Sequence, residues 1–197
     1  MRIELLDFNI PDVDIPKREK EKHIFFTFLV DGISRACSHQ LVRHRPASYS
    51  QQSQRYVSMR EFPYVKPKSL DKVYVDTDAG RFSFDGVMSF LGDVYDSFVE
   101  AGVPREDARF VLPNACQTRI VFTMNGRELI HFLKLRTCNR AQWEIRDMAV
   151  SMLKLLRTKI PEIFKGVGPA CYMTGVCPEG EKSCGRQAEV VSFFENL

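Results

Sequence analysis

The chain contains 197 residues, of which 44% are hydrophobic, and it carries a formal net charge of +3. The length is typical of one domain, and the hydrophobic content argues against intrinsic disorder. The charge is too small to indicate nucleic-acid binding by itself, although it suits a ligand that carries phosphate groups.

No membrane-spanning or targeting segment is predicted. The chain has no run of about 18 apolar residues, which a membrane span requires. Charged residues interrupt Met1–Glu4, so the N-terminus does not resemble a signal peptide. Six cysteines without such a signal indicate reduced thiols and a cytoplasmic protein.

Two strands, a short helical turn and a helix are predicted first. Met1–Phe8 is a candidate strand, and Lys17–Lys22, which follows a proline-containing connector, is predicted to be an exposed helical turn. His23–Val30 is the clearest strand, because its β-branched and aromatic residues alternate between two faces. Apolar residues recur at helical spacing from Ile33, and proline is expected to end that helix near Arg45.

The chain after about residue 60 is predicted to be mainly helical up to the tail. A loop with a short strand near Val73–Val75 comes before an amphipathic helix that begins at about Val87. Asn125, with Glu128 three residues later, resembles a capping box, which leaves both helix capping and ligand contact open for Asn125. The other predicted elements are a helix between Pro104 and Pro113, the strand Thr118–Met124, and a helix from about Gln142 to Pro161.

Residues 166–197 form a tail rich in glycine, proline and cysteine. Cys171, Cys177 and Cys184 lie six and seven residues apart. No Cys-x-x-Cys pair and no histidine occur in the tail. It is therefore predicted to be loosely ordered, with free thiols rather than a metal site.

The most polar stretch, Arg43–Tyr56, contains three arginines, a histidine, three serines and two tyrosines. Residues 38–60 include no aspartate or glutamate, so anions that compensate a buried guanidinium must come from elsewhere in the fold or from a ligand. One interpretation places the Arg-His-Arg triad in the last turn of a helix, where the dipole stabilises cations. The further donors at Ser53 and Arg55 favour a site for a phosphate or a planar heterocycle.

The spacing of this stretch is Arg-His-Arg, seven residues, serine, one residue, arginine. It closely resembles the signature of the flavin-dependent thymidylate synthases. Further segments in the same order resemble that family, and the resemblance covers about His23 to Phe164. These segments are Phe26–Phe28, Ser34–Val42, Gly102–Arg105, Ala108–Pro113, Asn125 with Arg127, Leu133–Arg136, and Ala141–Glu144.

The resemblance implies an α+β fold with a central, largely antiparallel sheet flanked by helices, within a single domain. The family domain would occupy residues 1–165, with 1–22 as a divergent N-terminal segment and 166–197 as the tail. Family members assemble as homotetramers with sites shared between subunits. The same assembly is expected here, without nucleic-acid or membrane partners.

The resemblance also implies an enzyme of nucleotide biosynthesis that transfers a methyl group. The family converts deoxyuridylate (dUMP) to thymidylate (dTMP). Methylenetetrahydrofolate supplies the carbon, and FAD reduced by NADPH supplies the electrons. Carbon 5 of uracil is a poor nucleophile, and a fixed guanidinium at the carbonyl would stabilise charge on the ring without a protein nucleophile.

The resemblance assigns roles to individual residues. Arg136 would lie against the uracil carbonyl as the catalytic residue, and Ser53 would donate to phosphate rather than act as a nucleophile. The residues expected to contact FAD are Arg43, His44, Arg45, Gln51, Asn125, Arg127 and His131. Those expected to bind dUMP are Gln40, Arg43, Gln51, Ser53, Gln54, Arg55, Arg109 and Arg136. No residue is expected to bind a metal.

Two positions depart from the family pattern. Lys22 stands where members carry a glutamate just before the histidine that matches His23, and Gln51 stands where some carry glutamate. One alternative is therefore a member that binds FAD and nucleotide but has weakened or lost activity. A second alternative is a module that stacks single-stranded RNA on Tyr49 and Tyr56 beside the arginines.

Overall fold

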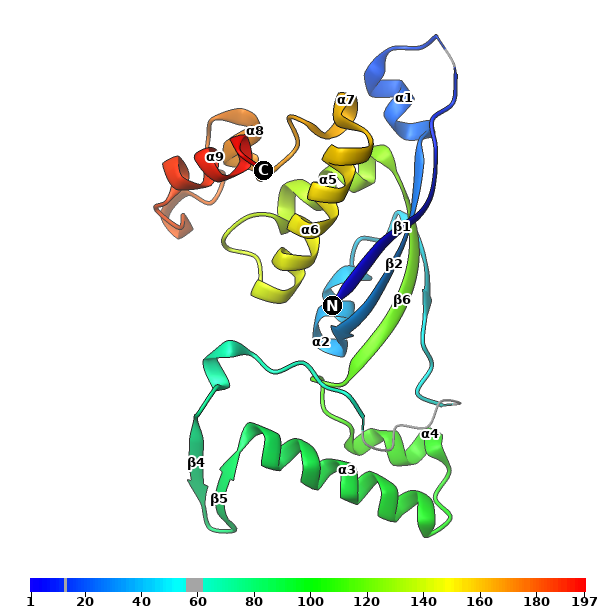
Figure 1. The fold of residues 1–197 in the computed structure, drawn as a ribbon, viewed down its shortest axis with the longest axis vertical. Helices are drawn as coiled ribbons and strands as arrows, with labels where there is room; N and C mark the ends of the chain where they lie inside the picture. Colours follow the sequence, from blue (N-terminus) through cyan, green and yellow to red (C-terminus); the bar gives the residue numbers. More distant parts are fainter. Residues whose placement is uncertain (13, 56–61) are drawn as a thin grey trace. The chain divides into compact units, whose positions relative to one another are not determined.

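A computed structural model describes residues 1–12, 14–55 and 62–197 (Figure 1). Tyr56, one of the two tyrosines considered for RNA stacking, lies outside the described residues. The chain separates into two compact units, each built from segments that are distant in the sequence. Unit 1 comprises Met1–Val30, Gln40–Tyr49 and Val121–Leu197, and unit 2 comprises Asp31–His39 and Ser50–Ile120.

The main sheet is antiparallel and, within the described residues, has four strands in the order β1-β2-β6-β3. The sheet and the helices around it confirm the predicted α+β class (Figure 1). Three of the strands were predicted, two of them from alternation, whereas the fourth, β3, lies inside the polar stretch and shows no apolar face in the sequence. The strands are β1 (Arg2–Asn9), β2 (Phe25–Ser34), β3 (Ala47–Gln51) and β6 (Gln117–Asn125).

One face of β2 lies in the core of unit 1. Phe26 and Phe28 are fully buried, as their alternation predicts. Phe28 stacks on Phe122 of β6 with ring centroids 5.6 Å apart, and Phe26 meets Phe164 edge-on at 5.4 Å. Phe164 belongs to α7 (Pro161–Phe164), so the helix packs against this face. Burying each of these rings stabilises the fold by roughly 1.5–3 kcal/mol.

The junction between β2 and α2 (Arg35–Leu41) differs from the prediction. The strand continues past Val30, because Gly32 turns the chain with a φ of 77° that glycine adopts without strain. The helix begins only after Ser34, whose hydroxyl accepts a hydrogen bond of 3.0 Å from the amide three residues later. The helix also ends earlier than the predicted Arg45. The Arg-His-Arg triad therefore follows α2 and does not form its last turn.

The helices α5 (Gly126–Arg136) and α6 (Trp143–Lys159) begin close to where the sequence predicts. The Asn125 side-chain oxygen accepts a hydrogen bond of 2.8 Å from the amide of Glu128, so Asn125 caps α5. The Gln142 side-chain oxygen accepts from the amides two and three residues later, at 3.1 and 3.2 Å. Such caps stabilise a helix start by about 0.5–2 kcal/mol, because the first amides have no partner within the helix.

The first residue of α5 is a glycine for a steric reason. A Cβ atom at Gly126 would lie 2.9 Å from the carbonyl oxygen of Glu21, which belongs to α1 (Lys17–His23). We expect Gly126→Ala to lower the free energy of unfolding by about 1 kcal/mol, the lower end of the cost of overpacking. Gly166→Ala is the matched control, because no atom lies within 4 Å of its Cβ position. Urea unfolding measures both variants, and equal losses would contradict the packing argument.

The C-terminal tail is folded, so the prediction of a loosely ordered tail is wrong. It contains α8 (Ala170–Thr174), the 3-10 turn Gly180–Lys182 and α9 (Gln187–Glu195). Phe194 of α9 is fully buried. The Arg157 guanidinium on α6 donates hydrogen bonds to the carbonyl oxygens of Phe194, at 2.6 Å, and Val167, at 2.8 Å. These bonds attach the tail to the body of unit 1.

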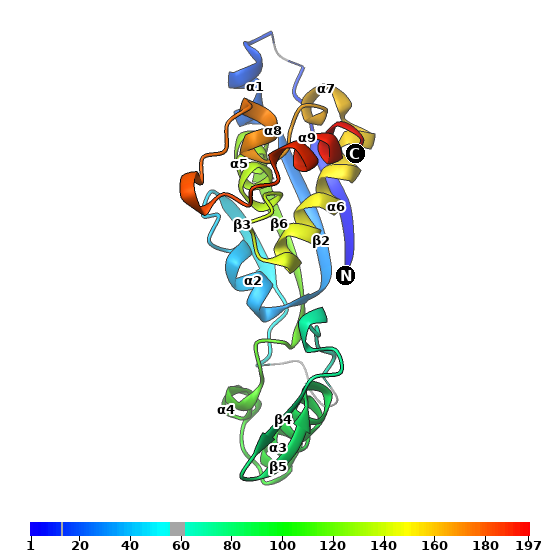
Figure 2. The same ribbon diagram turned by 90° about the vertical axis from the view of Figure 1, so that its left-hand side faces the viewer.

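Unit 2 contains a hairpin and a long amphipathic helix (Figure 2). Strand β4 (Tyr74–Thr77) pairs antiparallel with β5 (Gly80–Ser83), and only the first of these strands was predicted. Helix α3 (Phe84–Glu100) starts three residues before its predicted beginning, because the Ser83 hydroxyl caps it by accepting from the Gly86 amide at 3.1 Å. The remaining elements are the 3-10 helices Lys68–Leu70 and Arg109–Val111 and the short helix α4 (Arg105–Ala108).

Candidate active site

The histidine of the polar stretch lies at the centre of a buried cluster in unit 1. His44 is 7% exposed, and its Nε2 atom accepts a hydrogen bond of 3.0 Å from Nε of Arg136. Glu128 Oε1 lies 3.8 Å from Nδ1 of His44, and the Phe132 ring packs edge-on with its centroid 4.9 Å away. Residues 92 positions apart in the sequence are thereby brought into direct contact.

The environment of His44 keeps its imidazole neutral. Burial is the largest cause, and together with the charges of Arg136 and His131 it lowers the pKa of His44 from 6.5 to about 4. Because Nε2 accepts the hydrogen bond from Arg136, the single proton of the neutral ring resides on Nδ1, on the side of Glu128. The contacts therefore fix both the tautomer and the orientation of the ring.

Tyr49 holds the segment that carries His44. Its hydroxyl lies within donating distance of two carbonyl oxygens, 2.7 Å from that of His44 and 3.0 Å from that of Leu41. Burial and the charge of Glu128 raise the pKa of Tyr49 to about 12, so it keeps its proton. These bonds satisfy carbonyls at the end of α2. The ring also packs on Phe122, with centroids 6.0 Å apart, so Tyr49 is not presented for base stacking.

Exposed cations flank this cluster. Arg43 and Arg45 stand on either side of His44 in the sequence, and Arg127 immediately precedes Glu128. All three arginines are exposed, and none forms an ion pair with the described part of the chain. Guanidinium groups beside a neutral imidazole suit a planar ligand that carries phosphates. The other predicted residues in unit 1 are His131, whose ring centroid lies 6.3 Å from that of His44, half-buried Gln40, and Asn125.

A second set of predicted residues lies in unit 2, around Glu106. The Arg55 guanidinium pairs with the Glu106 carboxylate, with nitrogen–oxygen distances of 2.9 and 2.6 Å. Arg109 Nε donates to the Glu106 carbonyl oxygen at 3.0 Å. Burial and, after it, the charge of Arg109 lower the pKa of Arg35, which places a third guanidinium in this neighbourhood. The concentration of positive charge suits a phosphate group.

Two further predicted residues have hydrogen-bond partners inside unit 2. Nε2 of Gln51 donates to the hydroxyl oxygens of Ser38, at 2.9 Å, and Thr118, at 3.2 Å. The Ser53 hydroxyl accepts a hydrogen bond of 3.2 Å from the amide of Arg55, which is a turn contact and not a nucleophile–base pair. Gln54, the remaining predicted residue in unit 2, lies in the turn that follows.

Known proteins were compared with the chain. A family described as "Thymidylate synthase complementing protein" (Thy1) matches residues 21–162. The "Flavin-dependent thymidylate synthase" of Geobacter sulfurreducens is 55% identical over 178 residues, which cover 89% of this chain and 75% of the relative. Proteins of the same name from Clostridium tetani (44% over 188 residues, 88% and 74% covered) and Nitratidesulfovibrio vulgaris (47% over 174 residues, 84% and 69% covered) are also similar.

The chain belongs to the flavin-dependent thymidylate synthase family.

Membership in the flavin-dependent thymidylate synthase family confirms the resemblance that the spaced motif indicates. It places the chain among enzymes that transfer a methyl group. The matched region, residues 21–162, contains every residue that the sequence predicts for the site. The RNA-binding alternative gains no support from the comparisons or from the packed ring of Tyr49.

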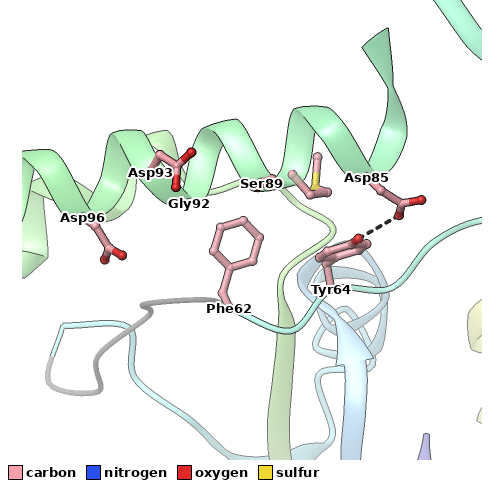
Figure 3. A pocket seen from close by; sticks show the side chains of 8 residues that line it. Phe62, Tyr64, Asp85, Ser89, Gly92, Asp93 and Asp96 are labelled. Carbon is pink, nitrogen blue, oxygen red and sulfur yellow. Dashed lines mark hydrogen bonds between the residues drawn. The ribbon is translucent and has the colours of Figure 1, made fainter.

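The pocket drawn in Figure 3 is a poor match for an anionic flavin or nucleotide. This pocket in unit 2 encloses about 340 Å³, and Figure 3 shows the carboxylates of Asp85, Asp93 and Asp96 beside the rings of Phe62 and Tyr64. The Tyr64 hydroxyl donates a hydrogen bond of 2.7 Å to Asp85. Carboxylates repel phosphate groups, so this pocket is not part of the candidate active site.

Sequence reasoning did not include Tyr49, Glu128, Glu106 or Arg35 among the residues predicted to bind FAD or dUMP. Tyr49 acts through its hydroxyl on the backbone, and Glu128 is interpretable from sequence only as part of a capping box. Arg35 lies within the family-like segment Ser34–Val42, which is the signal that points to it. The position of each in a motif is visible in the sequence, but its contact with a distant residue is not.

Three features bear on metals, membranes and redox state. Across residues 1–12, 14–55 and 62–197, no group of three or more His, Cys, Asp or Glu side chains is arranged to hold a metal ion. Over the same residues, no helix combines the length and apolar character needed to span a bilayer. The cysteines at positions 37, 116, 138, 171, 177 and 184 are free thiols.

Proposed function

We propose that this family member converts dUMP to dTMP, with methylenetetrahydrofolate as carbon donor and NADPH as the reductant of bound FAD. The observation that carries the proposal is the hydrogen bond of 3.0 Å between Arg136 and His44. It joins the arginine expected at the uracil carbonyl to the histidine of the family signature. A guanidinium held in one orientation by a neutral partner is preorganised to stabilise negative charge on a substrate ring.

The residues proposed for FAD fit the chemistry of that group. Bound FAD supplies the electrons that reduce the transferred carbon. The exposed guanidinium groups of Arg43, Arg45 and Arg127 have no ion pairs within the described residues, so they can compensate the charge of the FAD phosphates. The polar contacts proposed to complete the site are His44, Gln51, Asn125 and His131.

The residues proposed for the phosphate of dUMP centre on Arg55 and Arg109. Both bind Glu106, the first through its carboxylate and the second through its carbonyl oxygen. A phosphate competes directly with the Glu106 carboxylate for Arg55, because both are anions that match the guanidinium fork. The residues proposed to complete the dUMP site are Gln40, Arg43, Gln51, Ser53, Gln54 and Arg136.

We also propose a cytoplasmic homotetramer with sites shared between subunits. Large aromatic side chains on unit 2 support this assembly, because Phe110 is 83% exposed and Phe90 is 60% exposed. Aromatic residues are enriched at subunit interfaces and costly to leave in water. Phe110 directly follows Arg109, so a contact made by this ring would lie next to a residue proposed to bind dUMP.

The proposed activity is tested by the absorption spectrum of the purified protein and by tritium release from dUMP labelled at carbon 5. We expect flavin bands in the visible range, and tritium release that requires both NADPH and methylenetetrahydrofolate. Protein that stays colourless after incubation with FAD and releases no tritium would contradict the proposal. Flavin bands without tritium release would instead support the alternative of a family member that has lost activity.

A further inference from the structure

An arginine on α6 is partly buried without a partner. Nε of Arg146 is inaccessible to solvent and has no hydrogen-bond partner. No ion pair or hydrogen bond joins the Arg146 side chain to the described part of the chain. Nε of Arg157 on the same helix is also buried without a partner, but the terminal nitrogens of Arg157 donate to two backbone carbonyls at 2.6 and 2.8 Å. Arg157 is held by the fold, whereas Arg146 keeps an uncompensated charge.

Arg146 faces a pocket in unit 1. The pocket encloses about 230 Å³, and its wall is formed by residues of α6 and α9 together with the loop before α6. Val190 and Phe193 supply an apolar side, and the amide of Asn139 adds hydrogen-bonding groups. Within the described residues, this amide makes one hydrogen bond, of 3.9 Å to the sulfur of Cys184, and that bond is weak.

The charges around the pocket favour one anionic group. Arg186 and Glu189, which also line it, pair with each other at 2.9 and 2.6 Å and so compensate each other. The positive charge of Arg146 is therefore left over. The Glu189 carboxylate disfavours a second negative charge on a ligand, because like charges repel at short range. A planar guanidinium next to an apolar wall favours a ligand that carries an oxyanion on an apolar organic group.

We propose that this pocket binds a small organic molecule through one oxyanion, a carboxylate or a phosphoryl group. Arg146 and Asn139 hold the oxyanion, and Phe193 and Val190 pack against the apolar part. The pocket shares no residue with the proposed FAD and dUMP sites, so the inference does not depend on the proposed function. It describes a binding site formed by the C-terminal tail on the body of unit 1.

Trp143 provides a built-in probe. It is the only tryptophan of the chain, and it precedes Arg146 by three residues on α6, so the two side chains occupy the same helix face. Purified protein is titrated with acetate and, separately, with inorganic phosphate at constant ionic strength, while Trp143 fluorescence is recorded. We expect a saturable change for one or both anions. In Arg146→Met the affinity falls by about tenfold or more, because the charged donors are lost.

Arg140→Met is the matched control, because it removes a nearby exposed cation that does not line the pocket. We expect the response of this variant to equal that of the wild type. A fluorescence change that survives Arg146→Met reports another site and overturns the proposal, as does the absence of any saturable response. Tighter binding of acetate assigns a carboxylate ligand, and tighter binding of phosphate assigns a phosphoryl ligand.

Thermal unfolding without added anion gives a second, independent test. Removing an uncompensated, partly buried charge leaves the unfolding midpoint of Arg146→Met unchanged or raised. A clearly lowered midpoint would mean that protein groups hold Arg146, and it would overturn the proposal. If binding and stability behave as expected, the midpoint of the wild type rises with anion concentration more than that of the variant.

Discussion

Replacing Arg136 by lysine is expected to lower the rate of dTMP formation by roughly 10²–10³-fold, the usual cost of losing one preorganised donor at a developing charge. Lysine keeps the positive charge but not the planar fork. Lysine also lacks the Nε–H group through which Arg136 donates a hydrogen bond of 3.0 Å to the neutral imidazole of His44. Tritium release under saturating dUMP measures the rate, and the visible spectrum checks that the FAD content stays at the wild-type level.

Two further variants separate catalysis from positioning. Arg81→Lys makes the same chemical change at an exposed site on β5, where the nearest carboxylate is 4.0 Å away, and is expected to keep the wild-type rate. His44→Gln keeps an acceptor for Arg136 but replaces the rigid imidazole with a flexible side chain, so its rate should lie between those of Arg136→Lys and the wild type. A rate of Arg136→Lys equal to that of the wild type would rule out the catalytic assignment. If Arg136→Lys and His44→Gln lost the same fraction of the rate, the hydrogen bond between Arg136 and His44 would account for the whole effect, and Arg136 would be a positioning residue.

The parts of the fold that were predicted correctly rest on short-range signals. The alternation of Phe26 and Phe28 is visible within a few residues, and both rings are fully buried in β2. Asn125 and Gln142 cap helices through amides two or three residues away, so the sequence next to each cap contains the whole interaction. Such elements need no knowledge of the distant chain.

The errors occur where distant groups decide the outcome. Proline is expected to end α2 near Arg45, yet the helix ends at Leu41, whose carbonyl oxygen is satisfied by the hydroxyl of Tyr49. The composition of the tail predicts loose order, yet Arg157 of α6 donates hydrogen bonds to two of its backbone carbonyls and helps to hold it in place. Neither the Tyr49 hydroxyl nor the Arg157 guanidinium is part of a periodic sequence pattern, so these two contacts could not be predicted from neighbouring residues.

The same division applies to the site. The signature identifies His44 and the arginines on either side of it, because the family resemblance preserves spacing. It does not reveal that His44 accepts a hydrogen bond from Arg136, or that burial keeps the imidazole neutral. The protonation state is a property of the folded environment, since desolvation and nearby cations shift a pKa while sequence neighbours alone do not.

The neutrality of His44 has a consequence for stability at acidic pH. The pKa of His44 is 6.5 as an unperturbed side chain and about 4 in the folded protein. Between these values the unfolded chain binds a proton that the folded chain excludes, so stability falls as the pH decreases from 6.5 toward 4. At pH 7 the His44 side chain is mostly neutral in both the folded and the unfolded chain, so almost none of this stability is lost. For this group alone, the expected loss between pH 7 and pH 5 is about 2 kcal/mol.

His44→Gln isolates this effect, because glutamine has no titratable group and its side-chain oxygen can accept from Arg136 in place of Nε2. Urea unfolding of both proteins at pH 7, 6 and 5 gives the free energies, and other titrating groups contribute to both curves alike. The wild type is expected to lose about 2 kcal/mol more than the variant by pH 5. Parallel curves would show that His44 is not held neutral. A protonated His44 cannot accept the hydrogen bond from Arg136, so the imidazole would then have no part in orienting Arg136.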